Sequence, residues 1–191
     1  MYIRSFLNRF ALLVVALLIM ATGFSQSKTN IGLNFTGERT SASDFVVGFG
    51  GVLERQFSKQ HGLETGLYYR GFDLHSQVYV DGSLFGAYTI KEQHVSIPVL
   101  YKFYSSILNL SAGPTFDLYT GWKQGKSTIL GRIPRFSVDD KFQIGLLVKV
   151  SKIIPITKKL FVEPELRYNP IFYQRRVYYG IGVVAKYALT K

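Results

Sequence analysis

Three polar side chains, His94, Ser96 and Asp117, have the types that hydrolases combine as base, nucleophile and orienting acid. They fall on the polar positions of two neighbouring predicted strands, so a hydrolytic triad is one hypothesis. Their spacing fixes neither a common height nor the hydrogen bond between His94 and Ser96 that catalysis requires. We therefore expect these side chains to fill space inside the fold, and we predict no enzymatic activity.

A glycine-rich basic segment, Gly121-Trp-Lys-Gln-Gly125-Lys126-Ser127, has the composition of a phosphate-binding loop. It is one residue shorter than the G-x-x-x-x-G-K-[ST] motif, and neither an apolar parallel strand before it nor a helical pattern after it supplies the required context. We interpret it as an exposed basic loop, and we predict no nucleotide cofactor.

The metal-binding residue types are sparse. His61, His75 and His94 do not occur at metal-ligand spacing, and the chain contains no cysteine. The absence of cysteine excludes disulfides, thiolate chemistry and Cys-ligated metals. The sequence therefore predicts neither a metal nor any other cofactor.

The chain begins with a targeting pattern. Residues 1–9 include Arg4 and Arg9 and no acidic residue. An apolar run follows from Phe10 to Met20, and small residues come next. This order predicts a secretory signal peptide over residues 1–25, leaving a domain over 26–191. Removing Arg4 and Arg9 leaves 21 basic and 12 acidic residues, a net charge of about +9.

The mature segment has the composition of a strand-rich protein. Only 18% of the chain is charged, against roughly 25% in ordinary soluble domains, and glycine, tyrosine and phenylalanine are abundant. Apolar and other residues alternate with a period of two in eight segments, each close to the 9–11 residues of a tilted membrane-spanning strand. These segments are 30–36, 45–54, 62–70, 94–103, 108–119, 142–150, 162–168 and 176–187.

The two faces of these segments predict a barrel in lipid. One face is large, aromatic and continuous, which in water would promote aggregation. The other combines glycines with charges of both signs, as the narrow inside of an eight-stranded barrel requires. We predict an all-β fold, an eight-stranded antiparallel up-and-down transmembrane β-barrel of the outer membrane of a Gram-negative bacterium.

The inward-facing charges should pair, because unpaired ions in a narrow interior are costly. We expect a polar plug, with a small proton or ion path as the alternative. The predicted lumen residues are Glu54, Glu64, Arg70, Lys102, Asp117, Lys149, Glu163, Glu165, Arg167, Arg176 and Lys186.

The connections alternate between two sides. With the N-terminus in the periplasm, outer loops fall at 37–44, 72–90, 121–135 and 169–175, and inner turns at 56–61, 104–107 and 151–159. The outer loops carry basic residues whose natural partner at this surface is lipopolysaccharide phosphate, the alternative being ordinary solvated charge. These residues are Lys123, Lys126, Arg132, Arg135 and Arg175.

Three segments resemble a known family. His94-Val-Ser-Ile-Pro-Val-Leu-Tyr-Lys-Phe-Tyr104 resembles the strand with an "IP-L-KY" core in the Bacteroidetes PorT-like, porin-family outer-membrane β-barrel proteins. Leu110-Ser-Ala-Gly-Pro-Thr-Phe116 and Tyr179-Gly-Ile-Gly-Val-Val-Ala-Lys-Tyr187 are similar to other parts of that family. The resemblance implies an outer-membrane location and no enzymatic activity, and one namesake is associated with a secretion system.

The sequence thus favours a non-enzymatic structural or interaction protein with outer-membrane lipids, lipopolysaccharide and secretion-system or surface proteins as partners. Its compartment argues against nucleic acid. Rival hypotheses are porin-like passage of small solutes or hydrophobic ligands, a lipid-modifying outer-membrane enzyme, and a soluble periplasmic barrel. Conductance, lipid composition and fractionation without detergent separate them.

Overall fold

The computed structural model describes residues 28–40, 43–80, 83–127, 141–172 and 176–189. The predicted signal peptide, residues 1–25, lies outside them. The strands are β1 (Lys28–Thr40), β2 (Ser43–Gln56), β3 (His61–Val80), β4 (Ser83–Phe103), β5 (Asn109–Ser127), β6 (Phe142–Ser151), β7 (Ile154–Pro155), β8 (Leu160–Ile171) and β9 (Arg176–Ala188). No helix long and apolar enough to cross a membrane occurs in this described part.

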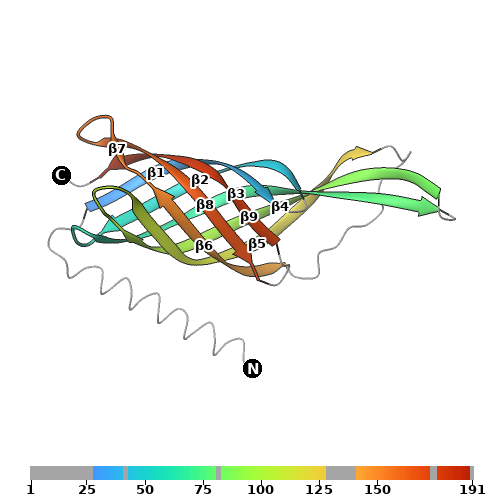
Figure 1. Cartoon of the computed structure of the whole chain (residues 1–191), viewed down its shortest axis with the longest axis horizontal. Coiled ribbons are helices and arrows are strands. Elements are labelled where there is room, and N and C mark those ends of the chain that lie inside the picture. The colour runs from blue at the N-terminus through green and yellow to red at the C-terminus, as the bar shows by residue number, and fades with distance from the viewer. Residues whose placement is uncertain (1–27, 41–42, 81–82, 128–140, 173–175, 190–191) are drawn as a thin grey trace, which may run out of the picture.

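Eight of these strands close into a barrel (Figure 1). Each long strand pairs antiparallel with the next along the chain, β9 pairs with β1, and β6 pairs with β8 to complete the ring. The two-residue strand β7 lies in the connection before β8 and pairs only with that strand among the described residues. The predicted eight-stranded up-and-down barrel is confirmed, with β7 as a small addition.

The period-two alternation sets which way each side chain points. Leu33, Phe49 and Ile181 point outward and expose 61%, 55% and 59% of their surface. Between them in sequence, inward positions such as Asn34 and Glu54 are buried. The apolar surface therefore faces away from the barrel axis, the reverse of a soluble barrel.

Inward glycines let bulky lumen side chains approach the wall. A Cβ placed on Gly182 would lie 2.8 Å from Oε1 of Glu165. A Cβ on Gly50 would lie 2.9 Å from Cδ1 of Tyr68. Any larger residue at either position would displace a buried side chain, so both glycines serve packing in a narrow interior.

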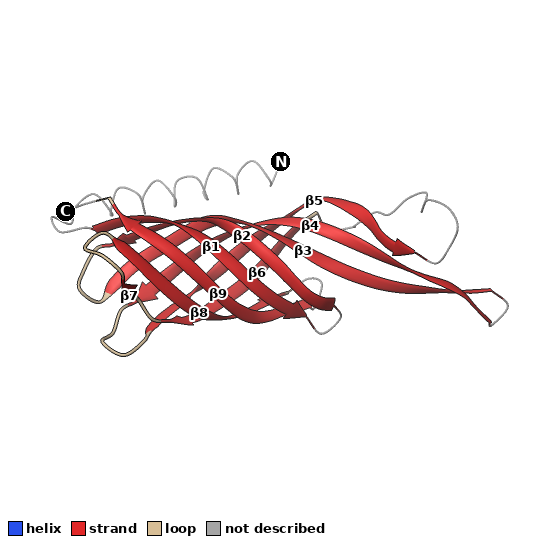
Figure 2. Ribbon diagram, turned by 90° about the horizontal axis from the view of Figure 1, so that it is seen from above, coloured by secondary structure: helices blue, strands red, loops and turns tan. Residues whose placement is uncertain are grey.

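Strands β3, β4 and β5 continue past the barrel as a three-stranded extension, called the arm here (Figure 2). The β2–β3 ladder ends at Phe49–Tyr69 and the β5–β6 ladder ends at Leu118–Phe142, whereas β3, β4 and β5 stay paired to Val80, Ser83 and Ser127. The arm and the β7 connection lie at opposite ends of the barrel in both views (Figures 1 and 2).

The arm corrects two predicted outer loops. Residues 72–80, 83–90 and 121–127 are strands, not loops. The missed signal is in the sequence: Val78, Tyr79 and Val80 favour strands, and Asp81-Gly82 is a dipeptide that favours a two-residue hairpin turn. Strands β1 and β2 likewise reach Thr40 and Ser43, so the first predicted outer loop is also too long.

Candidate functional site

The polar interior of the barrel is the candidate site. The alternation that places apolar residues outside directs every second residue toward the axis. Ten of the eleven predicted lumen residues are buried, and the side chain of the eleventh, Arg176, is 17% exposed. These side chains meet as follows, beginning at the end of the barrel where β7 lies.

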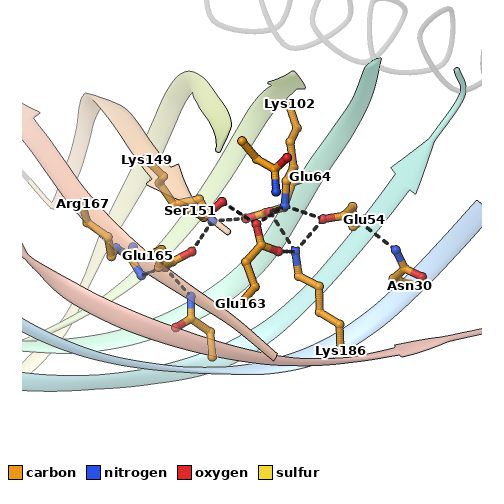
Figure 3. Close-up of polar contacts among 12 residues, drawn as sticks. Asn30, Glu54, Glu64, Lys102, Lys149, Ser151, Glu163, Glu165, Arg167 and Lys186 are labelled. Atoms are coloured by element: carbon orange, nitrogen blue, oxygen red, sulfur yellow. Dashed lines mark hydrogen bonds and ion pairs between the residues drawn. The ribbon is translucent and has the colours of Figure 1, made fainter. Parts of the chain in front are cut away.

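Two lysines and two glutamates form the first cluster (Figure 3). Lys186 Nζ lies 2.5 Å from both Glu54 Oε2 and Glu163 Oε2. Lys102 Nζ lies 2.8 Å from Glu54 Oε2 and 2.5 Å from Glu163 Oε1. Asn30 donates a 2.8 Å hydrogen bond to Glu54, so each charge in the cluster has more than one partner.

Lys149 joins this cluster to the next one. It contacts Glu64, which also lies 3.4 Å from Lys186 Nζ and 3.5 Å from Lys102 Nζ. On the other side, Lys149 Nζ lies 2.7 Å from Glu165 Oε2. A single buried ammonium therefore connects carboxylates from β3 and β8.

Two arginines continue the chain of ion pairs. Arg167 Nη1 lies 3.1 Å from Glu165 Oε1, and Arg167 Nε lies 3.2 Å from Glu38 Oε1. Arg70 then lies 3.7 Å from Glu38 Oε2 and 2.6 Å from Asp117 Oδ1. Arg70 also donates a 2.7 Å hydrogen bond to Asn169 Oδ1, which comes from the opposite side of the barrel.

These contacts form one connected set, called the lumen network here. All eight barrel strands contribute to it, and many of its pairs join strands that are not neighbours in the ring. Its acids are Glu38, Glu54, Glu64, Asp117, Glu163 and Glu165, and its bases are Arg70, Lys102, Lys149, Arg167 and Lys186. Because the charged ends meet across the axis, they fill the lumen.

A separate cluster closes the end of the lumen nearest the arm. Arg176 Nη1 lies 2.7 Å from Glu92 Oε2, and His94 Nε2 lies 3.2 Å from the same oxygen. Phe72 is buried and packs with Tyr178. The Cζ atom of Arg176 lies over the Phe72 ring, 3.8 Å from its centroid. The end of the lumen nearest the arm is therefore covered by aromatic rings and an ion pair.

Two of the buried acids are not among the predicted lumen residues. Glu38 and Glu92 lay in or beside segments that were predicted as outer loops. Glu38 continues the inward series Asn34, Thr36, and Glu92 precedes His94 by two residues. Extending the period-two pattern through these segments was the signal that would have found both residues.

The structure does not assemble the hypothetical triad. His94 is paired with Glu92, and Asp117 is paired with Arg70. Ser96 faces Asp117 across the β4–β5 ladder but forms no side-chain hydrogen bond within the described residues. The described part of the chain also contains no group of three His, Asp or Glu side chains able to hold a metal ion.

The segment that resembles a phosphate loop is also extended. Residues 121–124 and Ser127 pair with β4, with a shift of register at 125–126, so this segment runs along a sheet and does not wrap around an anion. Of the predicted lipopolysaccharide contacts, Lys123 and Lys126 are exposed on the arm. Arg132, Arg135 and Arg175 lie outside the described residues.

Known proteins share the fold of this chain. No family model and no curated protein matches its sequence. A major outer membrane protein from Thermus thermophilus is similar in structure, with a TM-score of 0.55, 14% identity, and coverage of 85% of this chain and 99% of that one. At this identity the similarity concerns the antiparallel barrel fold.

Two other solved structures are more distant in shape. The N-terminal β-barrel domain of Pseudomonas aeruginosa OprF has a TM-score of 0.46 and 14% identity, covering 85% of this chain and all 100% of that one. Ail of Yersinia pestis, in complex with the heparin analogue sucrose octasulfate, has a TM-score of 0.44 and 11% identity, covering 85% and 97%.

Proposed function

We propose that this protein is a non-enzymatic outer-membrane β-barrel with a plugged lumen and a structural or interaction role at the cell surface. The observation that carries the proposal is the inverted distribution of polarity. Apolar side chains cover the outside of the barrel, and a connected set of ion pairs fills the inside.

The outer surface supports the membrane location. Leu33, Val47 and Leu166 each expose more than 60% of their surface, and many other aliphatic and aromatic residues surround them. A soluble monomer rarely exposes a continuous apolar area of this kind, whereas hydrocarbon solvates it. Closure of the β6–β8 pair satisfies the backbone groups that an open sheet would leave unpaired in lipid.

The lumen supports the absence of a pore. An aqueous channel needs a continuous column of water, but here Lys102, Lys149 and Lys186 bring their ammonium groups to carboxylates across the axis. Eight strands leave an interior only wide enough for side chains to fill it. The plug then holds the wall rigid while the arm extends beyond it.

We also propose a bacterial group, a cleaved signal peptide and surface partners for this protein. The PorT-like resemblance and the cleaved signal peptide rest on sequence patterns, and they favour an outer-membrane protein of Bacteroidetes. Lys123 and Lys126 are exposed on the arm, which supports the proposal that they contact lipopolysaccharide phosphates. Surface proteins or a secretion apparatus are the proposed protein partners.

Reconstitution in planar bilayers tests the plug. We expect no reproducible open conductance from the unmodified protein, and recovery of the protein only in detergent-extracted outer membranes. A stable conductance would support the porin-like rival, and recovery without detergent would support the soluble barrel. Altered membrane lipids that return to normal in a Ser96→Ala strain would support the enzyme.

A further inference from the structure

The two ends of the lumen differ in how they are closed. Phe72, Ile171 and Tyr178 form a buried cluster at the end nearest the arm. The opposite end holds a cavity of about 450 Å³ in front of the lumen network. Its lining includes Lys28, Tyr104, Ile153, Lys158, Lys159 and Phe161. This volume falls within the range of small-ligand pockets.

The rim of this cavity is basic. The three connections at this end, residues 57–60, 104–108 and 152–159, contain Lys59, Lys152, Lys158 and Lys159 and no Asp or Glu. Lys28 enters the cavity from the start of β1. Within the described part of the chain, no ion pair joins Lys28, Lys158 or Lys159 to a carboxylate. The rim therefore carries positive charge that the described residues do not neutralise.

Among the described residues, Glu54 is the one acid in the cavity wall, and its charge is already paired. Glu54 lies at the back of the cavity, where Lys186 and Lys102 approach its Oε2 to 2.5 and 2.8 Å. Asn30 donates a further hydrogen bond to its Oε1. An anion entering the cavity would thus meet the rim lysines without facing an unpaired carboxylate.

The walls between these charges are largely apolar. Tyr104 is 8% exposed, and Ile153 and Phe161 are half-buried beside it. Lys159 lines the cavity, and its Nζ lies 5.8 Å from the ring centroid of Tyr187 on the outer face of β9, so this side chain lies at the edge of the barrel wall. The cavity therefore offers positive charge at its mouth and apolar surface within.

We propose that this cavity binds an organic anion with an apolar body, such as the carboxylate end of a peptide whose last residue is apolar. The anionic group would lie between Lys28, Lys158 and Lys159, and its apolar part against Tyr104 and Phe161. The inference rests on the proposed function, which turns this end of the barrel toward the periplasm. A peptide end and a free amphiphilic acid share this chemistry.

The test uses the full-length barrel in nanodiscs of zwitterionic lipid. Lysines are dimethylated with ¹³C, which keeps their charge, and followed by NMR. The probes are N-acetyl-Ala-Ala-Phe as the free acid, the same peptide as its amide, and hexanoate. We expect the free acid to shift the Lys28, Lys158 and Lys159 signals and the amide to leave them unchanged. Equal binding of hexanoate would identify a free acid as sufficient, and weak binding would favour a peptide end.

A matched pair of variants locates the site. Lys158→Gln/Lys159→Gln removes two rim charges and should weaken binding of the free acid about fivefold. Lys123→Gln/Lys126→Gln removes two exposed lysines from the arm and should not change it. Circular dichroism and the heat-dependent gel shift establish that both variants are folded.

Three results would overturn the inference: equal binding of acid and amide, unchanged affinity in the rim variant, or the same loss in both variants. The last result would indicate non-specific charge attraction. Failure of the proposed function is distinguishable from these outcomes. Conductance, or protease cleavage of residues 152–159 from the outside of intact cells, would refute the plug or the orientation without concerning the ligand.

Discussion

Strands β3, β4 and β5 belong to both the barrel and the arm, but the two regions are held together differently. Inside the barrel, β3 and β5 each have a neighbouring strand on both sides, and their inward side chains join the lumen network. In the arm, the ladders to β2 and β6 have ended, and only β4 remains paired with both β3 and β5. Strand propensity favours both regions, but closure into a ring and a buried ion-pair network stabilise only the barrel; the ion pair between Lys91 and Asp73 at the arm is solvent-exposed.

This difference also determines which region has a fixed register. A slip of one residue in a barrel strand would turn Glu64 or Lys149 outward into hydrocarbon and bring Leu63 or Val148 inside. The charged side chains therefore select one register for every barrel strand. The arm encloses no lumen, because its ladders to β2 and β6 have ended, so the same slip there would carry a much smaller penalty.

Breaking the lumen network should have the largest effect. Lys149→Met leaves Glu64 and Glu165 without the ammonium that joins them. Loss of one partner from a buried ion pair costs about 3–5 kcal/mol, so we expect a decrease of that size in the free energy of unfolding. Urea titration of the protein in lipid vesicles, with the folded and unfolded forms separated as gel bands, measures this free energy.

A nearby residue provides the control. Lys152→Met makes the same change three residues further on, where the side chain is exposed, and should alter stability by less than about 0.5 kcal/mol. Adding Glu64→Gln to Lys149→Met removes one of the two carboxylates that lost their contact with Lys149 and should restore part of the loss. Equal effects of Lys149→Met and Lys152→Met would mean that the network does not stabilise the barrel.

The sequence could predict the barrel but only part of the network. Period-two alternation is a local property, so the strands and the inward direction of Lys102 or Glu163 followed from it. Which base meets which acid depends on strand tilt and stagger, as for Lys186 and Glu54, which are 132 residues apart in sequence. The arm was missed because alternation does not indicate where a strand leaves the lipid.

A charge on the outside of the barrel should have the next largest effect. Leu67 faces outward in the middle of the barrel part of β3, opposite Gly51, and is 57% exposed. Leu67→Arg would place a cation in hydrocarbon and should reduce stability by about 2–4 kcal/mol. The matched change Ile107→Arg, in the turn between β4 and β5 where the side chain is 72% exposed, should cost less than about 1 kcal/mol.

These two variants also separate lipid from water as the outer environment. Unfolding in lipid vesicles measures both free energies under one condition. Were the outside of the barrel to face water, Leu67→Arg would be close to neutral, and the membrane location would have to be abandoned.

Shortening the arm should affect stability far less. Replacing residues 76–88 with Asn-Gly would join His75 to Thr89, which are already opposite each other in the β3–β4 ladder. Because the removed residues lie beyond the closed ring, we expect the unfolding free energy to change by less than about 1 kcal/mol. The same urea titration measures it, and a loss as large as that of Lys149→Met would show that the arm supports the barrel.

The smallest effect on stability, and a selective one on binding, is expected from Lys123→Gln/Lys126→Gln. Both side chains are exposed on the arm, so the unfolding free energy should stay within about 0.5 kcal/mol of the unmodified protein. If they contact lipopolysaccharide phosphates, the variant should bind lipopolysaccharide more weakly, and dephosphorylated lipopolysaccharide should bind the variant and the unmodified protein equally. Surface plasmon resonance on captured nanodiscs measures both.

Because the rim variant Lys158→Gln/Lys159→Gln removes the same charge from the other end of the barrel, it is the matched control. Equal losses of lipopolysaccharide binding in the two variants would indicate attraction to net charge and not a contact made by the arm.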